Sequence, residues 1–85
     1  MDRNRYELLS PLMGTFYRSS APGRAPLVDI GQTVQADDVV CAVESMKIFT
    51  ELRTAFSGVV KEILVENEEM VMKGQAIMII EKQAS

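Results

Sequence analysis

The sequence Glu44-Ser45-Met46-Lys47-Ile48 joins two apolar runs near the middle of the chain. Residues 39–43 (Val-Val-Cys-Ala-Val) lead into it, and residues 48–52 (Ile-Phe-Thr-Glu-Leu) follow it. Two strand-like runs with almost nothing between them predict a tight hairpin, with Lys47 at or beside its tip. The bend is unusual, because no Asn-Gly, Asp-Gly or Gly-X pair marks it. We therefore expect that a requirement other than turn stability selected Met46 and Lys47.

The composition excludes several classes of function. The chain has 85 residues, which make one small domain over residues 1–85 with an expected core over about 6–82. It contains no histidine and one cysteine, so the usual general base, a cysteine zinc site and an internal disulfide are all excluded. The net charge of −3 is spread along the chain and offers no footprint for nucleic acid. We expect no catalysis by the chain itself, no bound metal and no membrane span.

Cys41 lies inside an apolar run. A free thiol in such a run is expected to be a small core residue rather than a reactive group. A single unpaired cysteine also fits a reducing compartment such as the cytoplasm.

Short blocks of β-branched and aromatic residues, separated by turn residues, predict an all-β domain. No stretch of ten or more residues has a helical stripe. The expected extended segments are residues 6–9, 13–18, 27–28, 39–43, 48–52, 59–65 and 76–80, with short pieces at Val34 and Val71. Residues 19–26 (Ser-Ser-Ala-Pro-Gly-Arg-Ala-Pro) contain two prolines and a glycine, and therefore predict a loop.

An internal repeat relates the two halves of the chain. Residues 28–34 match residues 65–71 at an offset of 37, and the same offset pairs residues 39–44 with 76–81. Gly14 pairs with Gly58 at an offset of 44, so the first half has seven extra residues, which we assign to the loop at 19–26. Two four-strand copies predict a quasi-two-fold sandwich or flattened barrel, since neither copy could bury a core alone. Residues 44–48 would then link the halves, with the chain ends at the opposite pole.

One turn departs from the repeat. Gly31 of the first copy aligns with Glu68 of the second, and a glutamate does not favour positive φ. We expect the neighbouring Asn67 to adopt that conformation in its place.

The central motif resembles the biotin-attachment motif Glu-Ala-Met-Lys-Met of biotin-dependent carboxylases. Residues 10–17 (Ser-Pro-Leu-Met-Gly-Thr-Phe-Tyr) are similar to the opening of the carrier domains of bacterial and plastid acetyl-CoA carboxylases. The loop at 19–26 lies where that subfamily has an insertion called the thumb. The resemblance covers about residues 10–81. It implies a barrel-sandwich hybrid of two four-stranded antiparallel sheets, with the modified lysine on an exposed hairpin.

By that resemblance Lys47 is the biotinylated residue. The motif that a biotin protein ligase recognises would be completed by Met46, Ile48, Glu44 and Ser45. Ser45 replaces the usual alanine and Ile48 the usual second methionine, and we expect recognition to survive these changes at a different rate. Full-length carriers of this family also have an upstream segment and an Ala/Pro-rich linker. We therefore expect this chain to be either an excised C-terminal domain or a naturally short carrier.

The resemblance also implies a function. A biotin protein ligase would activate biotin and attach it covalently to Lys47. A biotin carboxylase would carboxylate the biotin, and a carboxyltransferase would pass the carboxyl group to acetyl-CoA, which yields malonyl-CoA for fatty acid synthesis. The chain would be a non-catalytic swinging-arm carrier in the bacterial cytoplasm or the plastid stroma, monomeric when isolated. Arg24 in the thumb would offer a charged donor to the biotin.

Three alternatives share parts of this pattern. A lipoyl domain has the same fold and hairpin lysine, but its motif places Asp before the lysine and Ala after it. The carrier of another acyl-CoA carboxylase, a pyruvate carboxylase or a decarboxylase usually lacks the thumb. An unmodified β-barrel that only supports a complex would have no need of an intact motif around Lys47.

Overall fold

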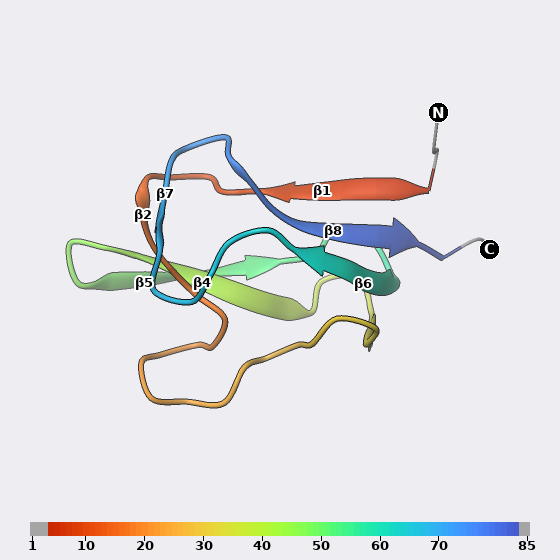
Figure 1. Ribbon diagram of the computed structural model, residues 1–85, viewed down its shortest axis with the longest axis horizontal. Coiled ribbons are helices and arrows are strands. Elements are labelled where there is room, and N and C mark those ends of the chain that lie inside the picture. Colours follow the sequence, from red (N-terminus) through yellow and green to blue (C-terminus); the bar gives the residue numbers. More distant parts are fainter. Residues whose placement is uncertain (1–3, 84–85) are drawn as a thin grey trace.

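The computed structural model describes residues 4–83, which form eight strands in two four-stranded antiparallel sheets (Figure 1). The strands are β1 (Arg5–Leu9), β2 (Gly14–Tyr17), β3 (Thr33–Val34), β4 (Val39–Ser45), β5 (Ile48–Arg53), β6 (Gly58–Ile63), β7 (Met70–Val71) and β8 (Ala76–Lys82). Sheet A has the order β1-β8-β6-β3 and sheet B the order β5-β4-β2-β7. The predicted all-β fold of two four-stranded sheets is confirmed. Residues 1–3 and 84–85 of the predicted single domain lie outside the described residues.

One hydrophobic core fills the space between the inner faces of the two sheets. Its fully buried side chains come from both halves of the chain and are Phe16, Val34, Val40, Cys41, Val43, Val60, Val71, Ile77, Met78 and Ile80. Each sheet turns a continuous apolar face toward the other, so each needs the other to remove that face from water.

The strand registers confirm the predicted quasi-two-fold repeat. In sheet B, Thr15 of β2 lies opposite Glu44 of β4. In sheet A, Val59 of β6 lies opposite Glu81 of β8. These are the same two positions of the repeat, since 59 follows 15 by 44 residues and 81 follows 44 by 37. The two halves therefore share their strand order and most of their pairing register. They differ at a bulge in β6, which places Glu62 opposite Ile79, whereas Tyr17 lies opposite Ala42 in sheet B.

Gly14 and Gly58 show why glycine occurs at the same place in both halves. A Cβ atom on Gly14 would collide with the carbonyl oxygen of Glu44. A Cβ atom on Gly58 would collide in the same way with the carbonyl oxygen of Glu81. Both contacts are with backbone atoms, which cannot rotate away.

The turn of the second half that lacks glycine corrects one expectation. Glu68 itself adopts positive φ, 70°, where Gly31 has 92°, so the assignment of that conformation to Asn67 was wrong. The Asn67 side chain accepts a hydrogen bond from the Arg18 N–H at 2.9 Å. The Glu68 N–H donates to the carbonyl of Phe16 at 2.6 Å, the bond that the equivalent turn also makes. Cross-strand hydrogen bonding therefore imposes the left-handed backbone on whichever residue occupies the position.

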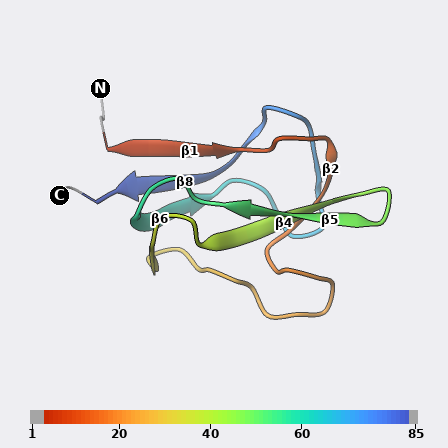
Figure 2. The ribbon, with the colours of Figure 1, turned by 180° about the vertical axis from the view of Figure 1, so that it is seen from behind.

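The segment at residues 27–28 also differs from expectation, because it pairs with no strand. The Leu27 N–H donates to the carbonyl of Arg18 at 2.9 Å and so closes the loop after β2. Val28 turns into the core and is 4% exposed. This loop runs along the outside of the molecule beside the half that carries β4 and β5 (Figure 2).

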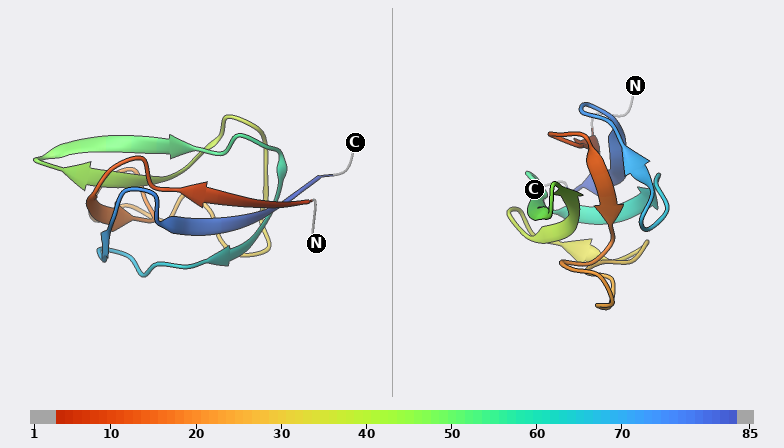
Figure 3. Two further views of the ribbon diagram at one scale, coloured as in Figure 1. Left: turned by 90° about the horizontal axis from the view of Figure 1, so that it is seen from above. Right: turned by 90° about the vertical axis from the view of Figure 1, so that its left-hand side faces the viewer.

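The molecule is flattened and elongated, with extents of 39 × 24 × 19 Å. The β4–β5 hairpin projects at one end of the long axis, and the start of β1 and the end of β8 lie at the other (Figure 3). The hairpin is thus the link between the halves, with the outer ends of the first and last strands at the opposite pole, as the repeat predicts.

Candidate functional site

The hairpin closes with the tightest common turn. Strands β4 and β5 pair up to Ser45 and Ile48, which leaves Met46 and Lys47 as the only two turn residues. Their φ angles are 52° and 67°, so both lie in the left-handed region that a type I′ turn requires. Asn and Gly adopt this region readily, whereas other residues lose roughly 1–2 kcal/mol each. The predicted hairpin is confirmed, together with a local cost at the residues of the motif.

The side-chain carboxylate of Glu44 stabilises this turn. Its Oε2 accepts a hydrogen bond from the backbone N–H of Lys47 at 2.8 Å. The bond satisfies the donor that points away from the strand ladder, and it fixes the peptide that carries the Lys47 side chain. The motif glutamate therefore has a role within the domain, at a spacing of three residues that the turn itself dictates.

The side chains at the tip are open to solvent. Met46 is 90% exposed and Ile48 is 67% exposed, while Lys47 is exposed and Ser45 is half-buried. The Lys47 amine forms no ion pair or hydrogen bond within residues 4–83. A long cationic side chain is thus held at the most projecting point of the molecule, free to meet a partner.

Cys41 is the single thiol of the chain, and its burial makes it unreactive. It lies in the core with no exposed surface, as the sequence predicts. Burial raises the pKa of the Cys41 thiol from its ordinary 9.0 to about 12, so the thiol stays protonated at neutral pH. Within the described residues there is also no group of three or more metal-binding side chains.

The loop at 19–26 is anchored by a residue that the sequence did not single out. The Arg18 Nη2 donates to the carbonyl of Val28 at 3.0 Å and to Asp29 Oδ1 at 2.8 Å. Arg24 is exposed near the end of the loop, and its N–H donates to the carbonyl of Ala21 at 3.3 Å. Within the described part of the chain, no hydrogen bond or ion pair joins Arg24 to the hairpin. Only the place of Arg18, directly before the Pro/Gly segment, could have indicated its anchoring role.

Two quasi-symmetric sheets, one of which extends into a hairpin with a free lysine at its tip, define a domain that presents one amine. The family described as "Biotin-requiring enzyme" matches residues 6–80, and the chain belongs to it. Membership implies a covalently attached biotin. No helix long and apolar enough to cross a membrane occurs within residues 4–83.

The chain is similar to biotin carboxyl carrier proteins of acetyl-CoA carboxylase. It is 41% identical over 78 residues to the one from Porphyra purpurea, an alignment that covers 92% of this chain and 50% of the relative. It is also 41% identical over 71 residues to the one from Pseudomonas aeruginosa, with 84% and 46% covered. The chain thus spans about half the length of the curated relatives it matches. Relatives with this name occur in bacteria and in chloroplasts.

Among solved structures, the urea carboxylase of Kluyveromyces lactis contains a similar domain. The TM-score is 0.77 at 29% identity, over 94% of this chain and 6% of that one. The family resemblance and the fold that it implied are therefore confirmed.

Proposed function

We propose that this chain is the biotin carboxyl carrier domain of an acetyl-CoA carboxylase, and that Lys47 is the residue that carries biotin. One observation carries the proposal: Lys47 is exposed, has no side-chain partner and stands on a strained two-residue turn at the link between the halves. Amide formation needs an accessible amine in a defined position, so the residues present fit covalently attached biotin.

The hairpin residues have separate parts in attachment. Met46 and Lys47 form the turn, and Glu44 holds the Lys47 peptide in place. The exposed side chains of Met46 and Ile48, with Ser45 beside them, form the surface that a biotin protein ligase reads. The ligase activates the biotin carboxyl group with ATP, and the neutral Lys47 amine displaces AMP to form an amide. This removes one positive charge, so the net charge changes from −3 to −4.

When attached, biotin carries a carboxyl group from a biotin carboxylase, which uses ATP and bicarbonate, to a carboxyltransferase that converts acetyl-CoA into malonyl-CoA. The domain itself is a non-catalytic carrier. Its rigid barrel positions Lys47 and raises the local concentration of the tethered group at each partner. We place it in the bacterial cytoplasm or the plastid stroma, as a monomer when isolated.

The ligation reaction tests the proposal directly. The chain is incubated with a biotin protein ligase, ATP and biotin, and its intact mass is measured. We expect one biotin-sized increment on the wild type and none on Lys47→Arg. Lys82→Arg is the matched control, because that lysine lies at the opposite pole, and it should gain the same increment as the wild type. An unmodified wild type, or an increment that persists on Lys47→Arg, would sink the assignment.

The acceptor needs a separate measurement. Biotinylated chain is supplied to the carboxyltransferase with acetyl-CoA or propionyl-CoA, and the carboxylated product is quantified. We expect malonyl-CoA as the main product. A clear preference for propionyl-CoA would assign the domain to another acyl-CoA carboxylase, with Lys47 unchanged as the attachment site.

Arg24 is proposed as a thumb residue that contacts the attached biotin. It is exposed on a loop that lies beside the hairpin half of the molecule, and two prolines limit the freedom of that loop. Deletion of residues 20–25 should increase the mobility of the biotin in NMR relaxation, and Arg24→Gln should give part of that increase. Equal biotin mobility in all three proteins would remove the contact.

A further inference from the structure

The outer face of sheet B carries a row of large apolar side chains next to the hairpin. Phe49, Glu44, Thr15 and Met70 lie opposite one another across β5, β4, β2 and β7, so their side chains are on one face. This is the outer face, because the neighbouring positions of these strands point into the core. We use the name "outer face of sheet B" for Phe49, Tyr17, Met70 and Met72, with the carboxylates Glu44 and Glu51 between and beside them.

Two aromatic rings form the centre of this face. Tyr17 and Phe49 are in contact, with ring centroids 5.2 Å apart. Ala42 lies opposite Tyr17 in the register and has no exposed surface. The rings therefore form a continuous apolar cover over β4.

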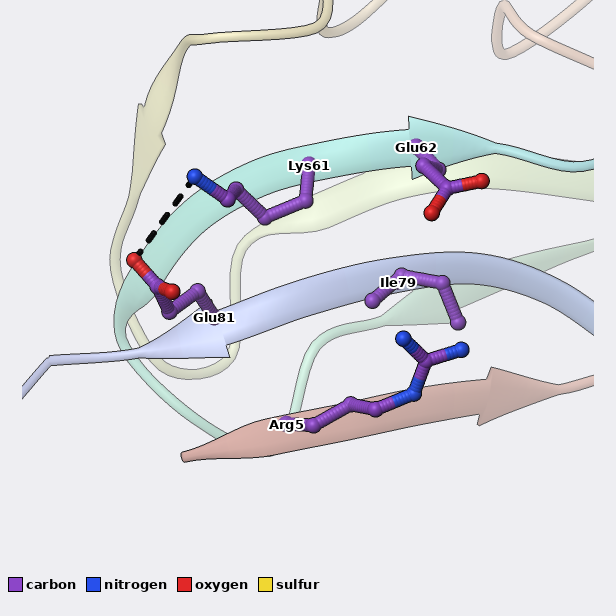
Figure 4. A pocket seen from close by; sticks show the side chains of 5 residues that line it. All are labelled: Arg5, Lys61, Glu62, Ile79 and Glu81. Carbon is purple, nitrogen blue, oxygen red and sulfur yellow. Dashed lines mark ion pairs between the residues drawn. The ribbon is translucent and has the colours of Figure 1, made fainter. Parts of the chain in front are cut away.

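The quasi-equivalent face of sheet A is polar. The repeat places Arg5 where sheet B has Phe49, and Lys61 where it has Tyr17. These two cations line a hollow of about 120 Å³ together with Glu62, Ile79 and Glu81, where sheet B has the aromatic contact (Figure 4). Lys61 is paired with Glu81 at 3.8 Å.

The methionines repeat the contrast at the other edge. Met70 is 61% exposed and Met72 is 55% exposed. Their equivalents in the first copy are Thr33 and Gln35, which are polar. One neighbouring pair has the opposite polarity, since the charged Arg53 at the far end of β5 in sheet B corresponds to the apolar Leu9 in sheet A.

This comparison separates fold from function. Both faces have the same position relative to the core, and the positions of Phe49 and Met70 have the same pairing register as their equivalents Arg5 and Thr33, so the fold makes equal demands there. At Tyr17 the registers differ, because β6 has a bulge at the equivalent Lys61 and Glu62 lies opposite Ile79. The polar version on sheet A satisfies those demands. Folding alone thus gives no reason for the exposed Met70 and Met72 or for the half-buried Phe49 on sheet B, and an apolar patch of this kind is typical of an interaction site.

We propose that the outer face of sheet B docks the biotin carboxylase that acts on the group carried by Lys47. The proposal rests on the proposed function above. The face is continuous with the hairpin, because Glu44 belongs to it and also holds the Lys47 peptide. A partner seated on this face would therefore have Lys47 at its edge, with the tethered group reaching into its active site.

Charge favours the carboxylase as the occupant. Glu44 lies opposite Phe49 and Glu51 lies two residues after it, and Arg53 on the same strand is shared between Glu51 at 3.7 Å and Asp37 at 3.9 Å. The complementary surface has an apolar centre with arginine or lysine around it. ATP and bicarbonate are both anions, so the mouth of a carboxylase site is electropositive. Acetyl-CoA holds its phosphates far from the acetyl group, so the carboxyltransferase needs less positive charge where biotin enters.

Face-exchange variants test the docking. The variant Phe49→Arg/Tyr17→Lys/Met70→Thr gives sheet B the residues of sheet A, and Arg5→Phe/Lys61→Tyr/Thr33→Met is the reciprocal control. Binding of the unmodified 85-residue chain to the biotin carboxylase encoded in the same genome is measured by calorimetry and by NMR shift perturbation. We expect the first variant to bind at least tenfold more weakly and the control to bind within twofold of the wild type. Shift changes should be confined to the hairpin and sheet B.

A milder variant guards against unfolding. Met70→Thr/Met72→Gln changes only exposed side chains, so its melting temperature should match that of the wild type, and we expect about threefold weaker binding. Unchanged binding in both sheet B variants, equal losses in the control, or no shift on sheet B at millimolar carboxylase would overturn the proposal. Shifts that depend on the concentration of the chain alone would assign the face to a second copy and also overturn it.

The ligation assay keeps this result separate from the proposed function. All face-exchange variants retain residues 44–48, so each should gain one biotin at the wild-type rate. Loss of ligation in the sheet B variants would make the ligase the occupant and exclude the carboxylase. Failure of the wild type to be biotinylated would remove the function itself, whatever the binding data show.

Discussion

The two poles of the molecule are built from equivalent strand pairs that differ in how their strands are connected. At one pole β4 and β5 continue into each other through Met46 and Lys47. At the other, the equivalent strands β8 and β1 pair without a connecting turn, and they carry the two chain ends (Figure 3). Features that occur at both poles, such as the β4–β5 and β8–β1 registers and the glycines at 14 and 58, are what the fold requires. Features that occur once, such as the left-handed Met-Lys turn, are the ones that the proposed function would require.

At the pole without a connecting turn, side-chain contacts hold the paired strands together, as the backbone turn does at the hairpin. Tyr6 meets Phe56 edge-on with centroids 5.0 Å apart, and the Lys82 Nζ lies 4.6 Å from the Phe56 ring centre. The Lys82 N–H also donates to the carbonyl of Asn4. These contacts hold β1, β8 and the β5–β6 connection together. The scaffold can therefore be closed without a strained turn, which makes the strain at Met46 and Lys47 more telling.

The paired glycines provide the largest test of the comparison. Gly14→Ala and Gly58→Ala each force a methyl group against a backbone carbonyl, so each should lower the free energy of unfolding by about 2–4 kcal/mol. That corresponds to a fall in melting temperature of about 10 °C or more, measured by circular dichroism. Equal losses within about 1 kcal/mol are expected, because the two contacts are equivalent.

Gly23→Ala is the control for the glycine pair. Gly23 has φ of 78° but no atom near its missing Cβ, so only the backbone preference changes. Its loss should be about 1 kcal/mol. If all three variants lost the same amount, the carbonyl contacts would not be the reason for glycine at 14 and 58.

The hairpin turn should gain stability when its function is removed. The variant Met46→Asn/Lys47→Gly has the residues that a type I′ turn favours, so we expect about 1–2 kcal/mol of added stability. It should accept no biotin. Chemical denaturation measures the first effect and intact mass the second. Lys47→Arg removes attachment without easing the backbone, so its stability should remain that of the wild type. A destabilised double variant would contradict the proposed cost of the turn.

The sequence predicted what the repeat duplicates and missed what depends on long-range bonds. Alternating apolar blocks, the 37-residue offset and the Pro/Gly loop were enough for the two sheets, the linking hairpin and the place of Lys47. The positive φ of Glu68 was missed, because a hydrogen bond to Phe16, some fifty residues away, imposes it. The role of Glu44 was missed as well, since a motif identifies a residue without showing which donor it meets. The contrast between the outer faces needed the registers of both sheets.

The turn at Glu68 gives a reciprocal pair of variants. Glu68→Gly should raise the free energy of unfolding by about 1 kcal/mol, because glycine adopts positive φ without a steric penalty. Gly31→Glu at the equivalent turn should lower it by about the same amount, since a Cβ atom there meets no other atom within 4 Å. Urea denaturation of both variants measures the pair. Changes of the same sign would show that the two turns are not equivalent in energy.

The smallest effect separates the two equivalent glutamates. Glu44→Ala removes the acceptor of the Lys47 N–H and should cost about 0.5–1 kcal/mol. Glu81→Ala loses only an exposed ion pair with Lys61, and its cost should stay below about 0.5 kcal/mol.

Amide exchange gives the residue-level readout for this pair. The Lys47 N–H should exchange faster in Glu44→Ala and at the wild-type rate in Glu81→Ala. Glu44→Gln keeps an acceptor oxygen at the same reach and should lie between the two. Ligation should be slowest in Glu44→Ala, intermediate in Glu44→Gln and at the wild-type rate in Glu81→Ala. The reason is that without Glu44 the ligase meets a turn that spends less time in the left-handed form. A Lys47 amide that exchanges equally fast in all of them would show that Glu44 acts on a partner and not on the turn.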